Sequence, residues 1–364
     1  MRIAQIAPLY EAVPPKLYGG TEMVTAHLCD ALIELGHDVT LFASADSATE
    51  ARLAPMRDKS LRLDAAPLKS DIAAHFGMLY EVRELGHRFD VLHFHIDMLH
   101  LPMFEPIAHR TVTTVHGRTD LEDLAGAYAR WHQYGLVSLT ERQRIPLPDA
   151  NWLATVSHGV SPARYRCSEH GKRGYLAFLG RIAPEKGPDV AIRVARQARI
   201  PLRIAAKVDA VDRVYFESVI RPLLDDPLIE FVGEIGAERK PEFLANALAL
   251  LFPIRWPEPF GLVMIEAMAC GTPVIAWDRG SVPEVIEPGL TGFVVRSDRQ
   301  ALAAISEVER LDRRAVRAAF ERRFTARRMA EAYLDVYQTL LAAPRTVGRG
   351  RYGRGATYGV RMGH

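Results

Sequence analysis

The sequence contains little cysteine. Its 364 residues include only three cysteines, Cys29, Cys167 and Cys270, which lie far apart along the chain. No two of them have the spacing of a metal site, so a cysteine-ligated metal is not expected. Cys29 and Cys270 lie within apolar helical patterns, which predicts buried thiols.

Long apolar runs are also missing. No stretch reaches the about 20 consecutive apolar residues that cross a bilayer. The first 15 residues hold one arginine, but neither the long apolar core nor the small-residue cleavage site of a signal peptide. We therefore expect a cytoplasmic protein that makes at most peripheral contact with a membrane.

A strong charge of either sign is missing too. The net charge is +2, but residues 345–364 hold five arginines and no acid, which leaves 41 basic and 44 acidic groups in residues 1–344. This tail is rich in glycine and has no apolar periodicity, so we expect it to be disordered. Weak contact with an anionic membrane or a nucleic acid is its alternative role. For the chain as a whole we expect no nucleic-acid partner.

The glycine fingerprint of nicotinamide-binding domains, G-x-G-x-x-G, is absent. The first strand is followed instead by LYGGTE, in which Gly19 and Gly20 let the backbone approach a ligand and Thr21 is expected to cap the next helix. A glycine-rich turn before a helix favours anions through its free N–H groups. A purely structural turn is the alternative.

The chain has the composition of an ordinary soluble protein, with 48% hydrophobic and 25% charged residues, and its length suits two domains. Apolar runs alternate with amphipathic helical patterns, which predicts parallel α/β architecture. The expected strands are Ile3–Ala7, Asp38–Ala43, Asp90–Phe94, Thr111–Val115, Trp152–Val156, Tyr175–Leu179, Leu202–Ala206, Ile229–Val232, Ala249–Phe252, Pro273–Ala276 and Gly292–Val294. The expected helices are Thr21–Leu35, Asp189–Ala198, Arg213–Leu224, Pro241–Ala247 and Phe260–Cys270.

The domain boundary is predicted in the polar segment Ala163–Arg173, so that residues 1–165 form one domain and 166–323 the other. A final helix within 324–344 is expected to pack back on the first domain. The aromatic and charged region Asp120–Pro148 is expected to be irregular, either a substrate-facing insertion or a plain surface excursion.

A single acid lies in the most apolar part of the chain. Glu266 is the only charged residue between Pro259 and Trp277, in a segment whose first part is predicted to form a buried helix. A lone buried carboxylate requires a binding partner. With Glu258 at the helix entrance, the pair predicts a ligand along this end of the helix; pairing of Glu266 with a cation from elsewhere in the chain is the alternative.

Two cations follow the first strand of the second domain. Arg181 and Lys186, in FLGRIAPEKG, lie where open α/β sheets bind ligands, and they suit a diphosphate. The alternative is two solvated cations that balance Glu185.

Histidines mark two strand ends. His93, His95 and Asp97 alternate on one face and form a weak metal candidate without further ligands. His116, before Gly117, is better placed to meet a substrate.

Taken together, these stretches resemble the family 4 retaining glycosyltransferases, which adopt the GT-B fold of two facing Rossmann-like domains. The matching elements are YGGTE, the strand-end TVHG with His116, the GRIAPEKG loop, EPFGLVMIEAMACGTPVIA with its E-x7-E spacing, and SVPEVIEPGLTGFVV at Ser281–Val295. The resemblance implies that residues 1–165 bind the acceptor and 166–323 the nucleotide-sugar.

The resemblance also implies residue roles. Arg181 and Lys186 hold the diphosphate, and Glu266 binds the ribose hydroxyls. Glu258 holds sugar hydroxyls, and His116 contacts the sugar near the reacting centre. Gly20 comes close to the phosphates, and Gly19 beside it belongs to the donor site. The loop with Gly233 and Ile235 lies near the base. The backbone N–H groups of Phe260, Gly261 and Leu262 help Glu258 to hold the sugar.

The expected reaction is transfer of a sugar, with retention, from a UDP- or GDP-linked donor to an unknown acceptor: a carbohydrate, a lipid-linked sugar or a small molecule. No Asp-x-Asp motif occurs, so no metal and no other cofactor is expected. Two alternatives stay open, a nucleotide-sugar 2-epimerase of similar layout and a catalytically silent nucleotide-sugar binding protein. The oligomeric state is not predicted.

Overall fold

The computed structural model describes residues 1–364 with the exception of 67, 168–172 and 343–364. The arginine-rich tail that the sequence predicts to be disordered therefore lies outside the described residues.

The first domain is built on a seven-stranded parallel sheet of order β3-β2-β1-β4-β5-β6-β7. A strand order that runs outward in both directions from β1 is that of a doubly wound nucleotide-binding fold. Its strands are β1 (Arg2–Ile6), β2 (Asp38–Ala43), β3 (Arg52–Pro55), β4 (Val91–Phe94), β5 (Thr111–Thr114), β6 (Gly135–Ser138) and β7 (Trp152–Thr155). The helices are α1 (Gly20–Glu34), α2 (Asp71–Leu85), α3 (Leu101–Phe104), α4 (Glu122–Arg130) and α5 (Glu141–Arg144).

The second domain repeats the same plan with six parallel strands in the order β10-β9-β8-β11-β12-β13. They are β8 (Leu176–Arg181), β9 (Leu202–Lys207), β10 (Ile229–Gly233), β11 (Ala249–Phe252), β12 (Val274–Trp277) and β13 (Gly292–Val295). Its helices are α6 (Pro188–Ala198), α7 (Arg213–Tyr215), α8 (Lys240–Ala245), α9 (Leu262–Ala269), α10 (Val282–Val285), α11 (Asp298–Val308) and α12 (Arg313–Arg323).

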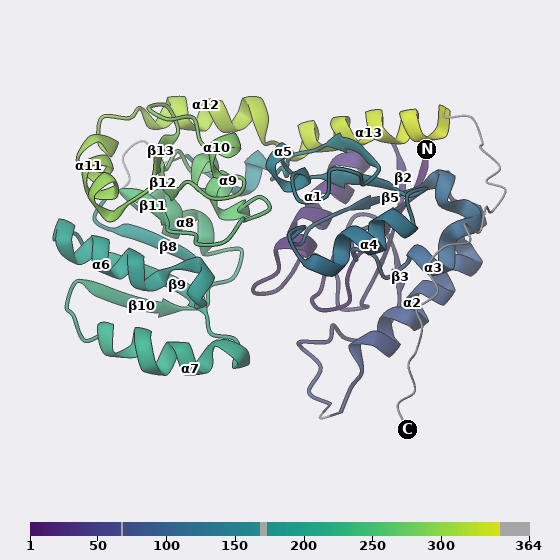
Figure 1. Cartoon of the computed structure of the whole chain (residues 1–364), viewed down its shortest axis with the longest axis horizontal. Coiled ribbons are helices and arrows are strands. Elements are labelled where there is room, and N and C mark those ends of the chain that lie inside the picture. The colour runs from purple at the N-terminus through teal and green to yellow at the C-terminus, as the bar shows by residue number, and fades with distance from the viewer. Residues whose placement is uncertain (67, 168–172, 343–364) are drawn as a thin grey trace, which may run out of the picture.

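Each sheet is covered by apolar cores on both faces, as expected for near-continuous apolar strands. The two domains lie side by side, and the last helix, α13 (Ala326–Ala342), runs back over the first one (Figure 1). Tyr333 and Tyr337 of α13 are buried there and form hydrogen bonds with Thr114, Gln5 and His93. The predicted GT-B architecture with a returning helix is confirmed.

The prediction for Asp120–Pro148 is wrong. This region contains α4 and α5, and it supplies β6, which pairs with β5 and β7 inside the first sheet. The apolar part of β6 is too short for periodicity to reveal it, and the aromatic and charged flanks obscure it.

The helix expected at Arg213–Leu224 is only partly regular. α7 passes into π-helical turns at Phe216–Ile220 and a 3₁₀ turn at Arg221–Leu223. Pro222 has no N–H to donate, so a regular α-helical ladder cannot continue through it.

Candidate active site

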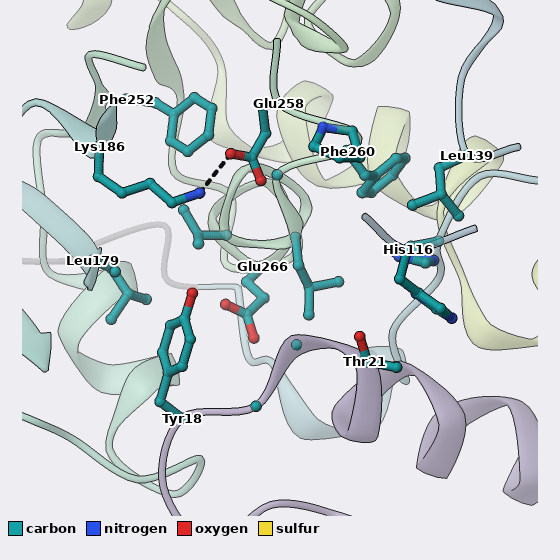
Figure 2. A pocket seen from close by; sticks show the side chains of 18 of the residues that line it. Tyr18, Thr21, His116, Leu139, Leu179, Lys186, Phe252, Glu258, Phe260 and Glu266 are labelled. Carbon is teal, nitrogen blue, oxygen red and sulfur yellow. Dashed lines mark hydrogen bonds and ion pairs between the residues drawn. The ribbon is translucent and has the colours of Figure 1, made fainter. Parts of the chain in front are cut away.

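A pocket opens between the two domains at the carboxyl ends of both sheets, where doubly wound folds bind ligands (Figure 2). Its unfilled space, with the open mouth included, is about 890 Å³. The first domain lines it with Tyr18, Gly19, Gly20, Thr21, His116, Leu139 and His158. The second domain contributes Phe178, Leu179, Gly180, Lys186, Lys240, Phe252, Glu258, Pro259, Phe260, Gly261, Leu262, Val263 and Glu266.

Glu266 of α9 is fully buried and points into this pocket (Figure 2). Its Oε1 accepts a hydrogen bond of 2.8 Å from the Tyr165 hydroxyl and lies 3.1 Å from Lys240 Nζ. The alternative that Glu266 pairs with a cation from elsewhere in the chain is therefore confirmed. Its Oε2, by contrast, is buried and has no hydrogen-bond partner among the described residues. An unpartnered buried carboxylate oxygen is costly and is available to a hydroxyl of a ligand.

Glu258 and Lys186 form a largely buried ion pair at the other side of the pocket. Glu258 Oε2 lies 2.5 Å from Lys186 Nζ and accepts a hydrogen bond of 2.5 Å from Trp256 Nε1. The Lys186 ammonium also lies 4.7 Å from the centre of the Trp256 ring, a cation–π contact. Without a ligand, Lys186 is thus held in place by Glu258, and an incoming phosphate would compete with that carboxylate.

The start of α9 faces the same space. The sequence predicted this helix from Phe260, but it begins at Leu262, because Gly261 adopts a left-handed conformation with φ of 80° as its N-cap. A Cβ atom at Gly261 would lie 2.7 Å from Met264 Cε and 3.0 Å from Phe252 Cζ, so only glycine fits without strain. The N–H groups of Phe260, Gly261 and Leu262 donate to no acceptor in the part of the chain that the structure describes. They remain free for ligand oxygens.

The glycine pair of the first domain lies opposite. Gly19 is the N-cap of α1, and a Cβ atom at Gly20 would meet nothing within 4 Å. Thr21 does not cap this helix, contrary to the prediction, because α1 already begins at Gly20 and no side chain caps it. Tyr18, just before, donates its backbone N–H to Glu234 Oε1 of the second domain (3.1 Å). Burial, and secondarily the charge of Glu258, raises the pKa of Tyr18 to about 12, so its hydroxyl keeps its proton.

His116 lines the pocket as predicted and lies beside His158, whose ring stacks on it with centroids 5.3 Å apart. His116 Nε2 lies 2.9 Å from His95 Nδ1. Burial lowers the pKa of His116 to about 3, so the ring is neutral at physiological pH. His93 and His95 belong to a hydrogen-bonded network, and no group of three or more potential metal ligands occurs within the described ranges.

Three predicted residues do not line the pocket. Arg181 lies just beyond Gly180 and forms ion pairs with Glu185 and with Asp212 (3.1 Å), while Asp209 lies 3.9 Å away. Gly233 ends β10 with φ of 78°, and Ile235 is buried in the core. The structure therefore brings together nine of the twelve predicted residues, excluding these three.

Three polar residues at or next to the pocket were not predicted from the sequence. Lys240 and Tyr165 hold Glu266, and His158 stacks on His116. The only sequence signal for a partner of Glu266 was the absence of any cation in its own helix, which does not identify Lys240 of α8. His158 follows β7 at a strand end, the same signal that identified His116.

The pocket therefore combines two lysines, free backbone N–H groups and two carboxylates in a largely buried site. Such a set binds oxyanions and sugar hydroxyls together. Across the described residues, no helix is long and apolar enough to cross a membrane.

Known proteins resemble this chain in sequence and in fold. Residues 18–161 match the model of Glycosyltransferase Family 4, and residues 166–322 match that of Glycosyl transferases group 1. A D-inositol 3-phosphate glycosyltransferase of Nocardia farcinica (strain IFM 10152) is 35% identical over 200 residues, 48% of this chain and 44% of the relative. The match thus spans less than half the length of that relative.

Two solved structures share the fold over nearly the whole chain. AviGT4, a glycosyltransferase involved in avilamycin A biosynthesis, has a TM-score of 0.74 at 24% identity and covers 94% of this chain and 98% of its own. HepE of Anabaena, in complex with UDP and glucose, has a TM-score of 0.74 at 16% identity and covers 93% of this chain and 100% of its own. The chain therefore carries a Glycosyltransferase Family 4 domain followed by a Glycosyl transferases group 1 domain.

Proposed function

We propose that the protein is a retaining glycosyltransferase that moves a sugar from a UDP- or GDP-linked donor to a hydroxyl of an acceptor. The observation that carries the proposal is Glu266 Oε2, a buried carboxylate oxygen without a partner among the described residues. It belongs to a residue that lines a pocket shared with two lysines and free N–H groups. A ribose hydroxyl would satisfy this oxygen, and a diphosphate would satisfy the cations.

The sugar-contacting groups are Glu258, His116 and the N–H groups at the start of α9, which lie around one space (Figure 2). As the bond from the anomeric carbon to the β-phosphate breaks, negative charge builds on that phosphate. Lys186 and the α9 N-terminus are positioned to stabilise such charge, which is commonly the largest catalytic contribution. The acceptor oxygen forms its bond on the same face, and its proton passes to the departing phosphate.

Arg181 keeps a proposed role in holding the diphosphate. Its guanidinium is surrounded by Glu185, Asp209 and Asp212, so it would reach a phosphate only by exchanging one of these carboxylates for it. Gly233 and Ile235 keep a proposed place near the base, since the adjacent Glu234 contacts Tyr18 at the edge of the pocket.

The donor nucleotide and the acceptor are open to a direct screen. HepE is described in complex with UDP and glucose, which makes UDP-glucose the first donor to test. The name of the curated relatives makes D-inositol 3-phosphate the first acceptor, beside carbohydrates and lipid-linked sugars. Release of UDP or GDP, measured with and without acceptors, is expected to depend on one nucleotide-sugar and one acceptor class. Interconversion of nucleotide-sugars without any acceptor would instead identify a 2-epimerase, and binding without turnover a silent binding protein.

We further propose that transfer needs no metal, because the lysines and helix N-terminus of the pocket provide positive charge for the diphosphate. Activity is expected to persist in excess EDTA. Loss of activity on chelation, restored by Mg²⁺ or Mn²⁺, would contradict metal independence.

A further inference from the structure

A chain of buried polar side chains leads from the pocket through the first sheet to α13. His116 Nε2 lies 2.9 Å from His95 Nδ1, and His95 Nε2 lies 2.8 Å from Gln5 Oε1. Gln5 Nε2 donates to the Tyr337 hydroxyl at 3.1 Å, and this hydroxyl lies 2.8 Å from His93 Nδ1. This series of hydrogen bonds ends at α13. His93 Nε2 lies 2.7 Å from Thr114 Oγ1, which in turn lies 2.7 Å from the Tyr333 hydroxyl.

Every ring in this chain is neutral. Gln5 and His93 are fully buried and His95 is 3% exposed, and no carboxylate in the described part of the chain forms a hydrogen bond with any of them. Burial lowers the pKa of His93 and His95 well below the ordinary value, with smaller contributions from neighbouring histidines. Asp97, the acid of this region, interacts with the backbone N–H groups of His116 and Gly117.

The amide of Gln5 fixes the direction of the chain. Its nitrogen donates to Tyr337, so its carbonyl oxygen faces His95 Nε2 and can only accept. His95 Nε2 therefore carries the proton, and the Nδ1 of this neutral ring is an acceptor. His116 Nε2 must then be the donor to His95 Nδ1. It follows that the proton of neutral His116 is on Nε2 and that its Nδ1 is a bare lone pair.

That lone pair has no partner among the residues that the structure describes. No described residue hydrogen-bonds with His116 Nδ1, while the residue itself lines the pocket. We propose that Gln5 and His95 are positioning residues that hold His116 as the Nε2–H tautomer, so that its Nδ1 accepts a hydrogen bond from a hydroxyl of the bound sugar. The tautomer follows from the protein alone, whereas the sugar contact rests on the proposed function.

The arrangement gives α13 a part in the site. The Tyr337 hydroxyl accepts from Gln5 and is free to donate its own proton to His93 Nδ1, so the observed orientation of the Gln5 amide leaves each of these groups with a partner. A helix from the C-terminal end of the described chain thereby takes part in setting which nitrogen of His116 carries the proton.

Nitrogen NMR tests the tautomer without any substrate. In protein labelled with ¹⁵N-histidine, long-range proton–nitrogen spectra distinguish protonated from unprotonated ring nitrogens, and a His116→Gln variant assigns the signals. We expect His116 to show a protonated Nε2 and an unprotonated Nδ1, unchanged from about pH 5 to pH 8. A protonated Nδ1, or titration near the ordinary histidine pKa, overturns the proposal.

Two variants test the positioning role. Gln5→Met removes the acceptor for His95. Tyr337→Phe removes the hydroxyl that accepts from Gln5, and it changes the shape of the side chain less than Gln5→Met does. In each, His116 is expected to populate both tautomers. Thr113→Val is the matched control, since Thr113 bonds His100 Nε2 at 3.0 Å in a separate buried pair on β5 and does not line the pocket. An unaltered His116 tautomer in both folded variants would overturn the positioning role.

Kinetic measurements test whether His116 Nδ1 accepts a hydrogen bond from the sugar. With the nucleotide-sugar that the wild type hydrolyses, kcat/KM is expected to fall about tenfold in Gln5→Met, the effect of one lost hydrogen bond. Affinity for UDP or GDP, which lack the sugar, is expected to stay within about twofold. Equal losses for nucleotide and nucleotide-sugar would contradict the sugar contact. Absence of turnover with every donor, together with the expected tautomer, would refute the proposed function and leave the positioning of His116 intact.

Discussion

At the residue scale, the site depends on how each charge is compensated. Glu266 is balanced on one oxygen by Lys240 and Tyr165 and left open on the other. Lys186 is balanced by Glu258. In the ligand-free pocket, both lysines are therefore ion-paired. A ligand gains binding free energy there only if it offers hydroxyls to the carboxylates and negative charge to the lysines.

Replacing Glu266 is expected to show this directly. Glu266→Ala should weaken binding of UDP or GDP more than tenfold, because a charged acceptor for a ribose hydroxyl is lost. Titration calorimetry with the 2′-deoxy and 3′-deoxy nucleotides tests this reason. For the analogue that lacks the hydroxyl bound by Glu266, the affinity should differ less between the wild type and Glu266→Ala. Glu307→Ala on α11 removes the same charge at a half-buried position that does not line the pocket, and it should bind like the wild type. If Glu266→Ala bound UDP or GDP with wild-type affinity, Glu266 would not be a ribose ligand.

Glu22 gives a prediction on stability. Burial, and to a lesser degree the nearby Glu11, raises the pKa of Glu22 to about 7 from 4.5. The folded state then retains a proton that the unfolded chain releases, so stability falls as pH rises from about 4.5 to 7. The expected loss is on the order of 3 kcal/mol. Glu22→Gln mimics the protonated form and should unfold at higher denaturant than the wild type at about pH 8, with the difference vanishing near pH 4.5. A difference that does not change with pH would contradict this account.

At the element scale, the start of α9 is the least replaceable turn of the site. Gly261→Ala places a Cβ against Met264 and Phe252 at φ of 80°. We expect it to lower the free energy of unfolding by about 1–3 kcal/mol and to weaken nucleotide-sugar binding, because the helix N–H groups shift. Gly126→Ala in α4, where a Cβ meets nothing within 4 Å, should instead stabilise by about 1 kcal/mol. Urea unfolding measures both, and equal effects would refute the strain at Gly261.

Much of this element plan was predictable from the sequence, and the reasons for the failures are physical. Buried parallel strands read as apolar runs, so β1 and β11 were placed within about a residue. The edge strand β3 is short, half-exposed and ends in Pro55, and β6 has only Leu136 and Val137 as strongly apolar residues, so neither produces a usable pattern. Glu266 was identifiable as a lone charge in an apolar helix. Its partner Lys240, and the Gln5–His95 support of His116, depend on tertiary contacts that one sequence does not encode locally.

At the scale of the whole molecule, the two domains are in contact around the pocket. Glu284 of α10 accepts hydrogen bonds of 2.8 Å from the N–H groups of both Glu141 and Arg142 at the start of α5. Thr140 donates to the Pro259 carbonyl at 3.2 Å, and Tyr18 donates to Glu234. These contacts bridge the domains beside the site, where closure would exclude water from the reacting groups.

Loss of the Glu284 contact is expected to open the molecule. Glu284→Ala removes two charge-assisted bonds to helix N–H groups, so the ligand-free protein should show a larger radius of gyration by X-ray scattering. A saturating nucleotide should reverse part of the change. The control Glu309→Ala changes the same charge at an exposed position in the second domain. Scattering curves that match for wild type and Glu284→Ala would show that this contact does not hold the domains together.

The most direct measurement is a crystal structure with UDP or GDP at saturating concentration. The account predicts the nucleotide between the domains, a ribose hydroxyl on Glu266 Oε2, and the diphosphate at Lys186 and the N-terminus of α9. A pocket that stays empty, with Lys240 still the sole charged partner of Glu266 and Lys186 still bound to Glu258, would contradict it.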